Sequence, residues 1–348
     1  MSQKAMYLPE KQGSFTLGSA SIPKPGPGEI LIKLEAAGLN PIDWKMQAFG
    51  FYIKEYPTIL GSDLAGTVEE LGEGVTNFKK GDRVLSESFG SSAYRGYQQY
   101  ALGYAVSTCK VPDQLSFDQA ATIPLGIATA TIALYHPGEG AINGSAALSP
   151  PWEQGGRGKY QGQPIMVVGG AGSVGQYAIQ LVKLSGFSPI ITTASPRNAE
   201  WLRKLGATHV LDRNLSDDAL KAEVKKITSD PIKVIYDTVA SSETQNVAYD
   251  LLAPGGTLAL VLPPEIKPEK QTADKTVFQV FGDFNVPPNR ALAASFYSNL
   301  TGLLEKGDIK PNPVEVVPNG LLGIPVGLKK LQQGVSNLKL VVRPQETP

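Results

Sequence analysis

Short apolar runs alternate with amphipathic stretches through the second half of the chain. Residues 173–184 carry apolar side chains at i, i+4, i+7 and i+8 counted from Val174, which is the spacing of one helical face. Residues 198–205 and 217–227 have the same period. Runs of strand type lie roughly 20–25 residues apart, at 164–168, 188–193, 208–211, 233–237 and 257–262. This alternation predicts βαβ units and a parallel sheet.

The first part of the chain follows a different pattern. Residues 30–35 alternate as a half-buried strand does, and short strands bounded by glycine are expected at 64–71 and 81–85. The last apolar run, 338–342, resembles this part. We therefore expect an α/β protein with two domains. Residues 1–124 and 286–348 form a mostly antiparallel β domain, and residues 125–285 form a doubly wound parallel domain.

Residues 137–163 are rich in Gly, Pro and Ser and show no clear period. They predict a long loop, which is either functional or a plain surface insertion.

Composition narrows the classes of function. The hydrophobic fraction of 42% is ordinary for a globular protein. The formal net charge is zero, so the charge of the chain does not favour binding to nucleic acid or to an anionic membrane. No window approaches 18 uninterrupted apolar residues, so no membrane span is expected. The N-terminal residues lack a signal-peptide core, and the single cysteine, Cys109, has no internal disulfide partner. A cytoplasmic protein is expected.

A cluster of glycines separates the first predicted parallel strand from its helix. Gly170, Gly172 and Gly175 form a G-x-G-x-x-G motif, which in this context predicts a dinucleotide-binding loop. Gly170 is expected to permit the tight turn and Gly172 the close approach of a pyrophosphate. Gly175 is expected to allow the helix to pack closely on the strand. The alternative is a glycine-rich turn with no ligand.

The residues after this loop indicate which dinucleotide is bound. The amides of Ser173 and Val174 open the helix and are expected to contact the pyrophosphate. NAD-dependent proteins carry an Asp or Glu about 20 residues past the motif. The second strand here ends instead with Thr193, Ser195 and Arg197. Hydroxyls and a guanidinium suit a 2′-phosphate, so NADPH is the expected cofactor. In the alternative, Arg197 only caps or solvates the next helix.

Several stretches resemble the medium-chain dehydrogenase/reductase superfamily. They are 25–43 (PGPGEILIKLEAAGLNPID), 59–84 (ILGSDLAGTVEELGEGVTNFKKGDRV), the GGAGSVG loop and 204–212 (KLGATHVLD). The resemblance covers nearly the whole chain and implies a GroES-like domain followed by a Rossmann domain. Within it, the chain is most similar to the zinc-independent quinone oxidoreductase and enoyl reductase branch. Residues 155–195 resemble fungal trans-acting enoyl reductases that serve polyketide synthases.

The residues at the metal positions agree with the zinc-independent branch. Zinc alcohol dehydrogenases of this superfamily bind the catalytic metal through Cys, His and a second Cys or Asp, and the matching residues here are Asn40, Ser62 and Leu125. Amide, hydroxyl and alkyl groups cannot build a zinc site. The lobe with four closely spaced cysteines is also missing. No metal is expected.

The activity that the resemblance implies is hydride transfer from NADPH to the activated C=C bond of an enone or enoyl thioester. A donor aimed at the carbonyl oxygen lowers the barrier, on the order of 3 kcal/mol. Lys45 is the first candidate donor, because it follows the matched metal position; a solvated lysine is the alternative. Tyr52 is the second, because quinone-reductase relatives carry a tyrosine near it. Phe49, Phe51 and Tyr56 predict an aromatic wall, or alternatively core.

The resemblance assigns further residues to the cofactor, each with packing as its alternative. They are Asn40, Thr129, Leu260, Leu262, Phe281, Gly282 and Lys339. His136 and His209 are not expected to act in catalysis, and His209 is expected to be a packed residue of a strand.

Three other functions compete with the leading one. They are NADPH:quinone oxidoreduction, action in trans as an enoyl reductase partner of a polyketide synthase, and NADPH binding without turnover. All of them are compatible with a homodimer, since relatives include both dimers and monomers.

Overall fold

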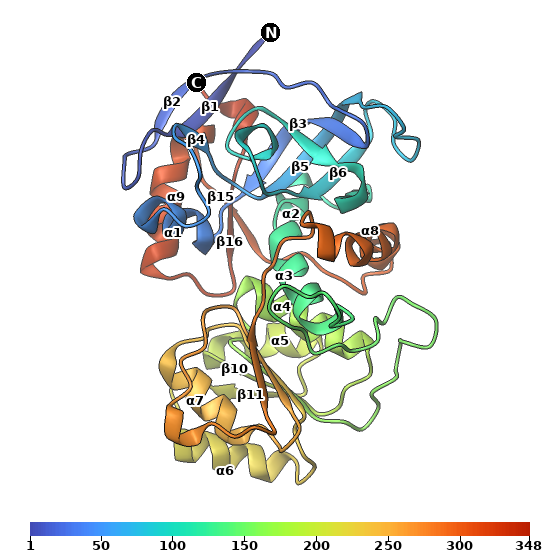
Figure 1. Ribbon diagram of the computed structural model, residues 1–348, viewed down its shortest axis with the longest axis vertical. Helices are drawn as coiled ribbons and strands as arrows, with labels where there is room; N and C mark the ends of the chain where they lie inside the picture. The colour runs from blue at the N-terminus through green and yellow to red at the C-terminus, as the bar shows by residue number, and fades with distance from the viewer. The chain divides into compact units, whose positions relative to one another are not determined.

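The computed structural model describes residues 1–348, and the chain divides into two compact units, drawn in Figure 1. The first unit comprises Met1–Leu125, Asp283–Lys306 and Pro311–Pro348. The second unit comprises Gly126–Gly282 and Gly307–Lys310.

The first unit is built on two mostly antiparallel sheets. The smaller sheet has the order β2 (Thr16–Ser21), β1 (Ser2–Leu8), β4 (Thr58–Ile59). The larger sheet has the order β15 (Val314–Val316), β16 (Lys339–Val342), β3 (Glu29–Gly38), β5 (Asp63–Leu71), β6 (Arg83–Glu87), β8 (Thr108–Lys110), and β7 (Tyr100–Tyr104) pairs with β3. Its helices are α1 (Pro41–Phe49), α2 (Phe117–Ala120), α8 (Arg290–Glu305) and α9 (Ile324–Gln333). Its 3-10 turns are η1 (Ser92–Tyr94), η2 (Ala105–Ser107), η5 (Pro287–Asn289), η6 (Gly320–Gly323) and η7 (Pro344–Glu346).

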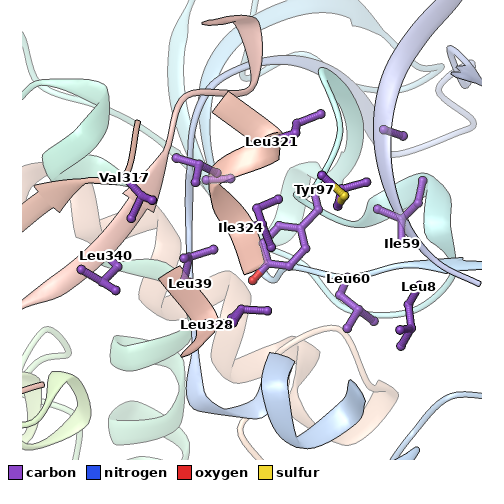
Figure 2. Close-up of a cluster of buried hydrophobic side chains, with 14 of the residues drawn as sticks. Leu8, Leu39, Ile59, Leu60, Tyr97, Val317, Leu321, Ile324, Leu328 and Leu340 are labelled. Atoms are coloured by element: carbon purple, nitrogen blue, oxygen red, sulfur yellow. The ribbon is translucent and has the colours of Figure 1, made fainter. Parts of the chain in front are cut away.

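The core of this unit that matters for the site surrounds Tyr97, whose side chain is fully buried. Figure 2 shows its ring among aliphatic side chains that come from β1, η6 and α9. The phenol is not left unsatisfied in this apolar setting, because its hydroxyl donates to Oδ2 of Asp43 at 2.6 Å. The core therefore fixes the N-terminal turn of α1, to which Asp43 belongs.

The second unit contains a six-stranded parallel sheet flanked by helices. The strand order is β11 (His209–Asp212), β10 (Ile190–Ala194), β9 (Ile165–Val168), β12 (Val234–Asp237), β13 (Thr257–Leu260), β14 (Thr276–Gln279). Its helices are α3 (Pro124–Tyr135, which begins at the end of the first unit), α4 (Ser173–Leu184), α5 (Ala199–Leu205), α6 (Asp217–Ile227) and α7 (Ser242–Leu251), with 3-10 turns η3 (Pro196–Asn198) and η4 (Pro268–Lys270). The order of the strands reverses between β9 and β12, which is where such sheets bind ligands.

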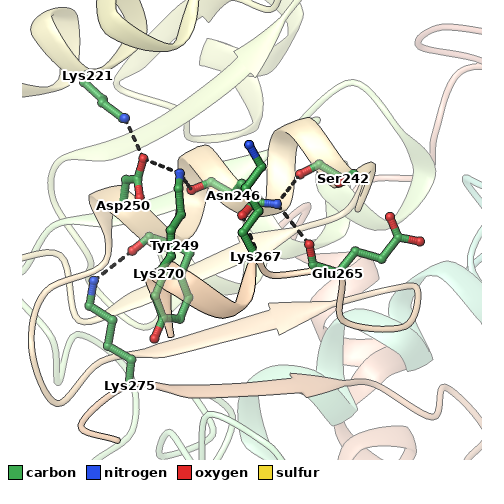
Figure 3. A network of polar contacts seen from close by, with 9 residues as sticks. All are labelled: Lys221, Ser242, Asn246, Tyr249, Asp250, Glu265, Lys267, Lys270 and Lys275. Atoms are coloured by element: carbon green, nitrogen blue, oxygen red, sulfur yellow. Dashed lines mark hydrogen bonds and ion pairs between the residues drawn. The ribbon is translucent and has the colours of Figure 1, made fainter. Parts of the chain in front are cut away.

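A polar network anchors the segment that follows β13. Figure 3 shows Asp250 of α7 between the ammonium groups of Lys221, at 2.6 Å, and Lys270, at 2.8 Å. Asn246, one turn earlier, donates to the carbonyl of Glu265 at 3.0 Å and accepts from the amide of Lys267 at 3.0 Å. These contacts hold residues 263–275 against α7.

The long segment between α3 and β9 contains no helix or strand, as expected, yet it is packed. The ring of Tyr160 stacks on Phe187, with centroids 4.7 Å apart, and Trp152 meets Tyr135 edge-on at 5.2 Å. The amide of Tyr160 also donates to the carbonyl of Ser185 at 2.9 Å. The second half of this segment is thus tied to the end of α4.

The stretch Phe117–Tyr135 is long and apolar enough, by length and composition, to cross a membrane, with a mean hydropathy of 1.2. This differs from the expectation that no window approaches a span. However, 72% of that window is buried inside the protein, and α2 and α3 divide it into two helices. Core helices of soluble proteins reach the same length and apolar composition, so this stretch is weak support for a membrane segment.

Two sequence expectations have clear outcomes. The predicted fold class is confirmed: a small antiparallel sheet, a mixed sheet and a Rossmann-like parallel sheet. The expectation for His209 was wrong, because β11 is an edge strand of the parallel sheet and leaves the side chain exposed.

Candidate functional site

The glycine loop joins the end of β9 to the start of α4 in the second unit. A side chain at Gly175 would place its Cβ 2.4 Å from the carbonyl oxygen of Gly169, so only glycine allows this helix to approach the strand. At Gly172 the nearest atom to a built Cβ is 3.4 Å away and the residue is exposed, so its backbone is open to a ligand. The two positions suit the predicted roles, which were the close approach of a pyrophosphate at Gly172 and the packing of the helix on the strand at Gly175.

The tight turn falls on a different glycine from the one predicted. Gly169 has a φ of +81°, a left-handed conformation that favours glycine, whereas Gly170 has no positive φ. Gly170 is required for packing instead, because a Cβ there would lie 2.2 Å from Oγ1 of Thr192. The pattern could not separate the two, since the chain has glycine at both positions.

Two buried polar atoms near this loop have no hydrogen-bond partner: Oγ of Ser173, the first residue of α4, and Oδ2 of Asp237, at the end of β12. Gly172, the residue before the helix, contributes no side-chain cap, and the amides of Ser173 and Val174 belong to a first turn that lacks intrahelical acceptors. Unused donors at a helix N-terminus favour an anion. The loop therefore fits the pyrophosphate of a dinucleotide.

The three residues predicted to contact the adenosine end of the cofactor lie at the end of β10 and in the turn that follows it. The hydroxyl of Thr193, which is buried, accepts from the amide of Gly169 at 3.0 Å, so this side chain holds the glycine loop. Ser195 is half-buried and begins η3, while Arg197 is exposed within that turn. Of the three residues, Ser195 and Arg197 therefore have the more accessible side chains.

The remaining candidates of the second unit fall at two places. Oγ1 of Thr129 would lie 2.4 Å from a Cβ at Gly282, so these two predicted residues are brought together. The carbonyl of Thr129 also accepts from the hydroxyl of Tyr236, at 3.2 Å. Leu260 is buried at the end of β13, and the half-buried residues Leu262 and Phe281 follow strands β13 and β14.

In the first unit, Asn40 and Lys339 meet around a buried carboxylate. Nζ of Lys339 lies 2.7 Å from Oδ2 of Asp63 and donates to Oδ1 of Asn40 at 2.5 Å. The same Asp63 oxygen accepts from Nδ2 of Asn40 at 2.7 Å. All three side chains are less than 5% exposed in this Asn40–Asp63–Lys339 triad.

This arrangement does not fit a catalytic zinc ion. The residues at the three matched metal positions all serve other contacts: Asn40 belongs to the triad, Ser62 accepts from Arg95 at 3.3 Å, and the amide of Leu125 donates to Asp63 at 2.6 Å. No group of three or more His, Cys, Asp or Glu side chains is placed to hold a metal ion.

Buried charges surround the triad. Burial raises the pKa of Asp43 to about 6, although hydrogen bonds from Tyr97 and Asn40 oppose that shift. Burial also raises the pKa of Glu87 well above its ordinary value, and the nearby charge of Asp283 adds to this. Arg95 is also buried; burial lowers its pKa, and the charges of Asp43, Asp283 and Glu87 oppose that shift. Sequence reasoning missed Glu87 and Arg95, because no motif or period marks either residue.

Lys45, the first predicted catalytic residue, lies in the middle of α1, and Tyr52, the second, lies in the turn that follows the helix. Lys45 is half-buried, burial alone lowers its pKa, and its ammonium sits 5.6 Å from the centroid of the Trp44 ring. Tyr52 is 54% exposed and has a φ of +59°, a left-handed conformation that is uncommon for a residue other than glycine. Gly50, with a φ of +73°, ends α1 and begins this turn.

Comparisons with known proteins give the family. Residues 26–121 match the alcohol dehydrogenase GroES-like domain, and residues 173–278 match the zinc-binding dehydrogenase domain. A trans-enoyl reductase from a Penicillium species is 30% identical, covering 98% of this chain and 97% of that protein. A trans-enoyl reductase from Aspergillus japonicus is 33% identical, covering 90% and 89%. A mycobacterial structure complexed with NADPH is 26% identical, with a TM-score of 0.76 and coverage of 98% and 100%.

The reversed strand order, the glycine loop and the helix N-terminus with unused donors define a dinucleotide-binding oxidoreductase that takes a nicotinamide cofactor. The chain belongs to the medium-chain dehydrogenase/reductase superfamily. It is therefore an enzyme, and the alternative of NADPH binding without turnover is set aside.

Proposed function

We propose that the chain is an NADPH-dependent, zinc-independent reductase of activated C=C bonds, with an enone or enoyl thioester as its substrate. The observation that carries this proposal is Lys45, a half-buried cation whose charge is neutralised by no carboxylate and whose helix begins beside the triad. The names of the relatives, trans-enoyl reductases at 30% and 33% identity, support the same reaction.

A bound nicotinamide supplies the hydride. The hydride would add at the β-carbon, and the side chains of the protein then have to stabilise the negative charge on the substrate carbonyl. A proton from a side chain or water adds at the α-carbon and completes the reduction. Lys45 is the donor assigned to that oxygen, and Tyr52 is the second candidate. A preorganised donor of this kind is worth on the order of 3 kcal/mol in the transition state.

The cofactor is assigned from the loop and from the end of β10. The loop shaped by Gly170, Gly172 and Gly175 presents the amides of Ser173 and Val174 to the pyrophosphate, and Ser195 and Arg197 hold the 2′-phosphate. The absence of a carboxylate at the end of β10 supports NADPH over NADH. The predicted contacts of Thr129, Leu260, Leu262, Phe281 and Gly282 complete the set in the second unit. Asn40 and Lys339 of the first unit stay predicted cofactor residues.

Oxidation of NADPH and of NADH, followed in parallel with an enone, an enoyl thioester and a benzoquinone, tests the proposal. Turnover of the enone or thioester with NADPH is expected. Turnover of the quinone alone would replace the proposal with quinone oxidoreduction, and preference for NADH would overturn the cofactor assignment. Turnover only of an acyl chain held on a polyketide synthase would restrict the enzyme to the trans-acting reaction.

A further inference from the structure

All three exposed aromatic side chains of the protein lie within four residues of one another. Phe49, Phe51 and Tyr52 are 52%, 50% and 54% exposed, whereas the other exposed large apolar residues are aliphatic and scattered. Phe49 ends α1, and the other two occupy the turn after it. Contiguous exposed apolar surface of this kind marks a binding site more often than isolated residues do.

These rings belong to a continuous row of five aromatic side chains, and the residue at each end of the row packs against the core. Centroid distances are 6.4 Å from Trp44 to Phe49, 5.3 Å from Phe49 to Phe51, 6.5 Å from Phe51 to Tyr52 and 6.0 Å from Tyr52 to Phe89. Trp44 and Phe89, the end members, pack against the core cluster around Tyr97. We call these five rings the aromatic strip.

A buried cation holds the far end of the strip. The guanidinium of Arg95 lies 4.0 Å from the centroid of the Phe89 ring, a cation–π contact inside the protein. Arg95 is itself held, because it donates to the carbonyl of Gly90 at 3.2 Å and to Ser62 at 3.3 Å. The other end of the strip meets a second cation, since Lys45 lies over Trp44.

The turn that carries the strip is strained where the exposed rings stand. Tyr52 has a left-handed backbone at φ +59°, which costs of the order of 1 kcal/mol or more for a residue with a side chain. The side chains of Phe51 and Tyr52 are about half exposed in this conformation. Strain retained at an exposed position favours a functional reason for it.

We propose that the aromatic strip binds the hydrocarbon chain of the acyl substrate, with the reacting carbonyl beside Lys45 and the chain extending toward Phe89. This inference rests on the proposed reduction of an enoyl thioester. It assigns the preference for chain length to Phe49 and Phe51. It also changes the membership of the aromatic wall expected from the sequence, which comprised Phe49, Phe51 and Tyr56. Tyr56, which packs against the same core, is not among the five rings that these centroid distances join.

The geometry favours a flexible hydrocarbon chain as the occupant over a rigid planar ring or a protein surface. Interplanar angles along the strip are 57°, 35°, 57° and 78°, so a rigid planar ring cannot stack on successive members, whereas a chain can turn along them. The three exposed rings offer about 300 Å² in total, taking half of roughly 200 Å² for each ring. A stable protein interface needs about 800 Å² from each partner.

The test compares trans-2-enoyl thioesters of four and twelve carbons. Wild type should show a higher kcat/KM for the longer substrate, and the Phe49→Gln/Phe51→Gln double variant should lower the ratio of the two kcat/KM values about tenfold, mainly through KM. Val326→Gln is the matched control, because Val326 is 69% exposed in the same unit and lies outside the strip. It should leave the ratio unchanged.

Binding of the saturated twelve-carbon thioester, measured by calorimetry, is independent of turnover. Weaker binding in the double variant supports a chain-binding role of the strip, even if no thioester is reduced. The absence of thioester reduction would refute only the proposed function. An unchanged ratio together with unchanged binding would overturn the strip. A defect seen only with a chain held on a synthase would also overturn it, because it would make the strip a protein-docking surface.

Discussion

The ammonium of Lys339 lies 2.7 Å from the carboxylate of Asp63, and both side chains are buried. Each oxygen of the carboxylate is satisfied, since Asn40 donates to Oδ2 at 2.7 Å and the amide of Leu125 donates to Oδ1 at 2.6 Å. A buried ion pair repays the loss of hydration only when such additional hydrogen bonds are present. The pair thus joins β16, β5 and the segment before α1 in the first unit.

Replacing Lys339 with Met should lower the free energy of unfolding by about 3–5 kcal/mol, because the substitution leaves Asp63 charged and buried. Urea denaturation measures the change. Lys330→Met is the matched control, because its ion pair with Glu315 is 45% and 44% exposed, and it should lose less than about 1 kcal/mol. The double variant Lys339→Met/Asp63→Asn should recover part of the loss. Equal small losses in both single variants would contradict this account.

The stability of the first unit should depend on pH through Asp43. Its pKa in the folded protein is raised to about 6, chiefly by burial, whereas an aspartate in an unfolded chain titrates near its model value of 3.8. The folded protein therefore binds more protons between these values, so this group's contribution is full at low pH and is lost as pH rises through the window.

Asp43→Asn removes the titration and keeps an oxygen to accept from Tyr97 and Asn40. The difference in unfolding free energy, wild type minus variant, should fall by up to about 3 kcal/mol between about pH 4 and pH 7. Denaturant titrations across this range give the difference. If it rose with pH, the carboxyl would have a lowered pKa and the burial argument would be wrong.

The sequence predicted local structure better than it predicted which residues meet. The helix expected at 173–184 is confirmed residue for residue in α4, and that expected at 217–227 in α6, because apolar period and end signals both act within one helix. In α6 the hydroxyl of Ser216 accepts from the amide of Ala219, which marks the first turn.

Contacts between residues that are far apart in the sequence leave no comparable pattern in that sequence. Phe89 and Arg95 lie far along the chain from Tyr52, and only the pairing of β5 with β6 and the packing on the Tyr97 core bring them together. The exposure of His209 was missed for a related reason: an apolar run indicates a strand, but not whether that strand lies at the edge of its sheet.

Lys45→Met should lower kcat for the enoyl thioester about 100-fold, because it removes the donor and keeps the apolar stem of the side chain. The dissociation constant for NADPH should change little. Lys54→Met is the matched control, since Lys54 is exposed nearby in the turn, and it should keep its kcat. Because burial lowers the pKa of Lys45, wild-type kcat should also decline at a pH below the ordinary lysine value of 10.5. An unaltered kcat in Lys45→Met would remove the donor assignment.

Two alanine substitutions in the glycine loop should separate folding from ligand binding. Gly175→Ala places a methyl 2.4 Å from the carbonyl oxygen of Gly169, so it should cost about 1–3 kcal/mol of stability as well as affinity. Gly172→Ala meets nothing closer than 3.4 Å, at a φ of −72° that any residue adopts, so thermal unfolding should change little. Its affinity for dinucleotide should nevertheless fall at least about tenfold, because the methyl stands where the pyrophosphate approaches. Intact binding by Gly172→Ala would place the phosphates elsewhere.

Arg197 decides between the two nicotinamide cofactors. Its guanidinium is exposed in η3, directly after β10, and no carboxylate occupies the end of that strand. Charge-assisted hydrogen bonds to a 2′-phosphate should make Arg197→Ala bind NADPH about tenfold more weakly, whereas NADH, which lacks the phosphate, should bind as before. Fluorescence titration with each cofactor measures both constants. Arg203→Ala, exposed on α5, is the matched control for loss of one positive charge, and it should leave both constants unchanged. An equal loss for NADPH and NADH in Arg197→Ala would show that the residue supports the turn rather than the phosphate, and the preference for NADPH would then lose its physical basis.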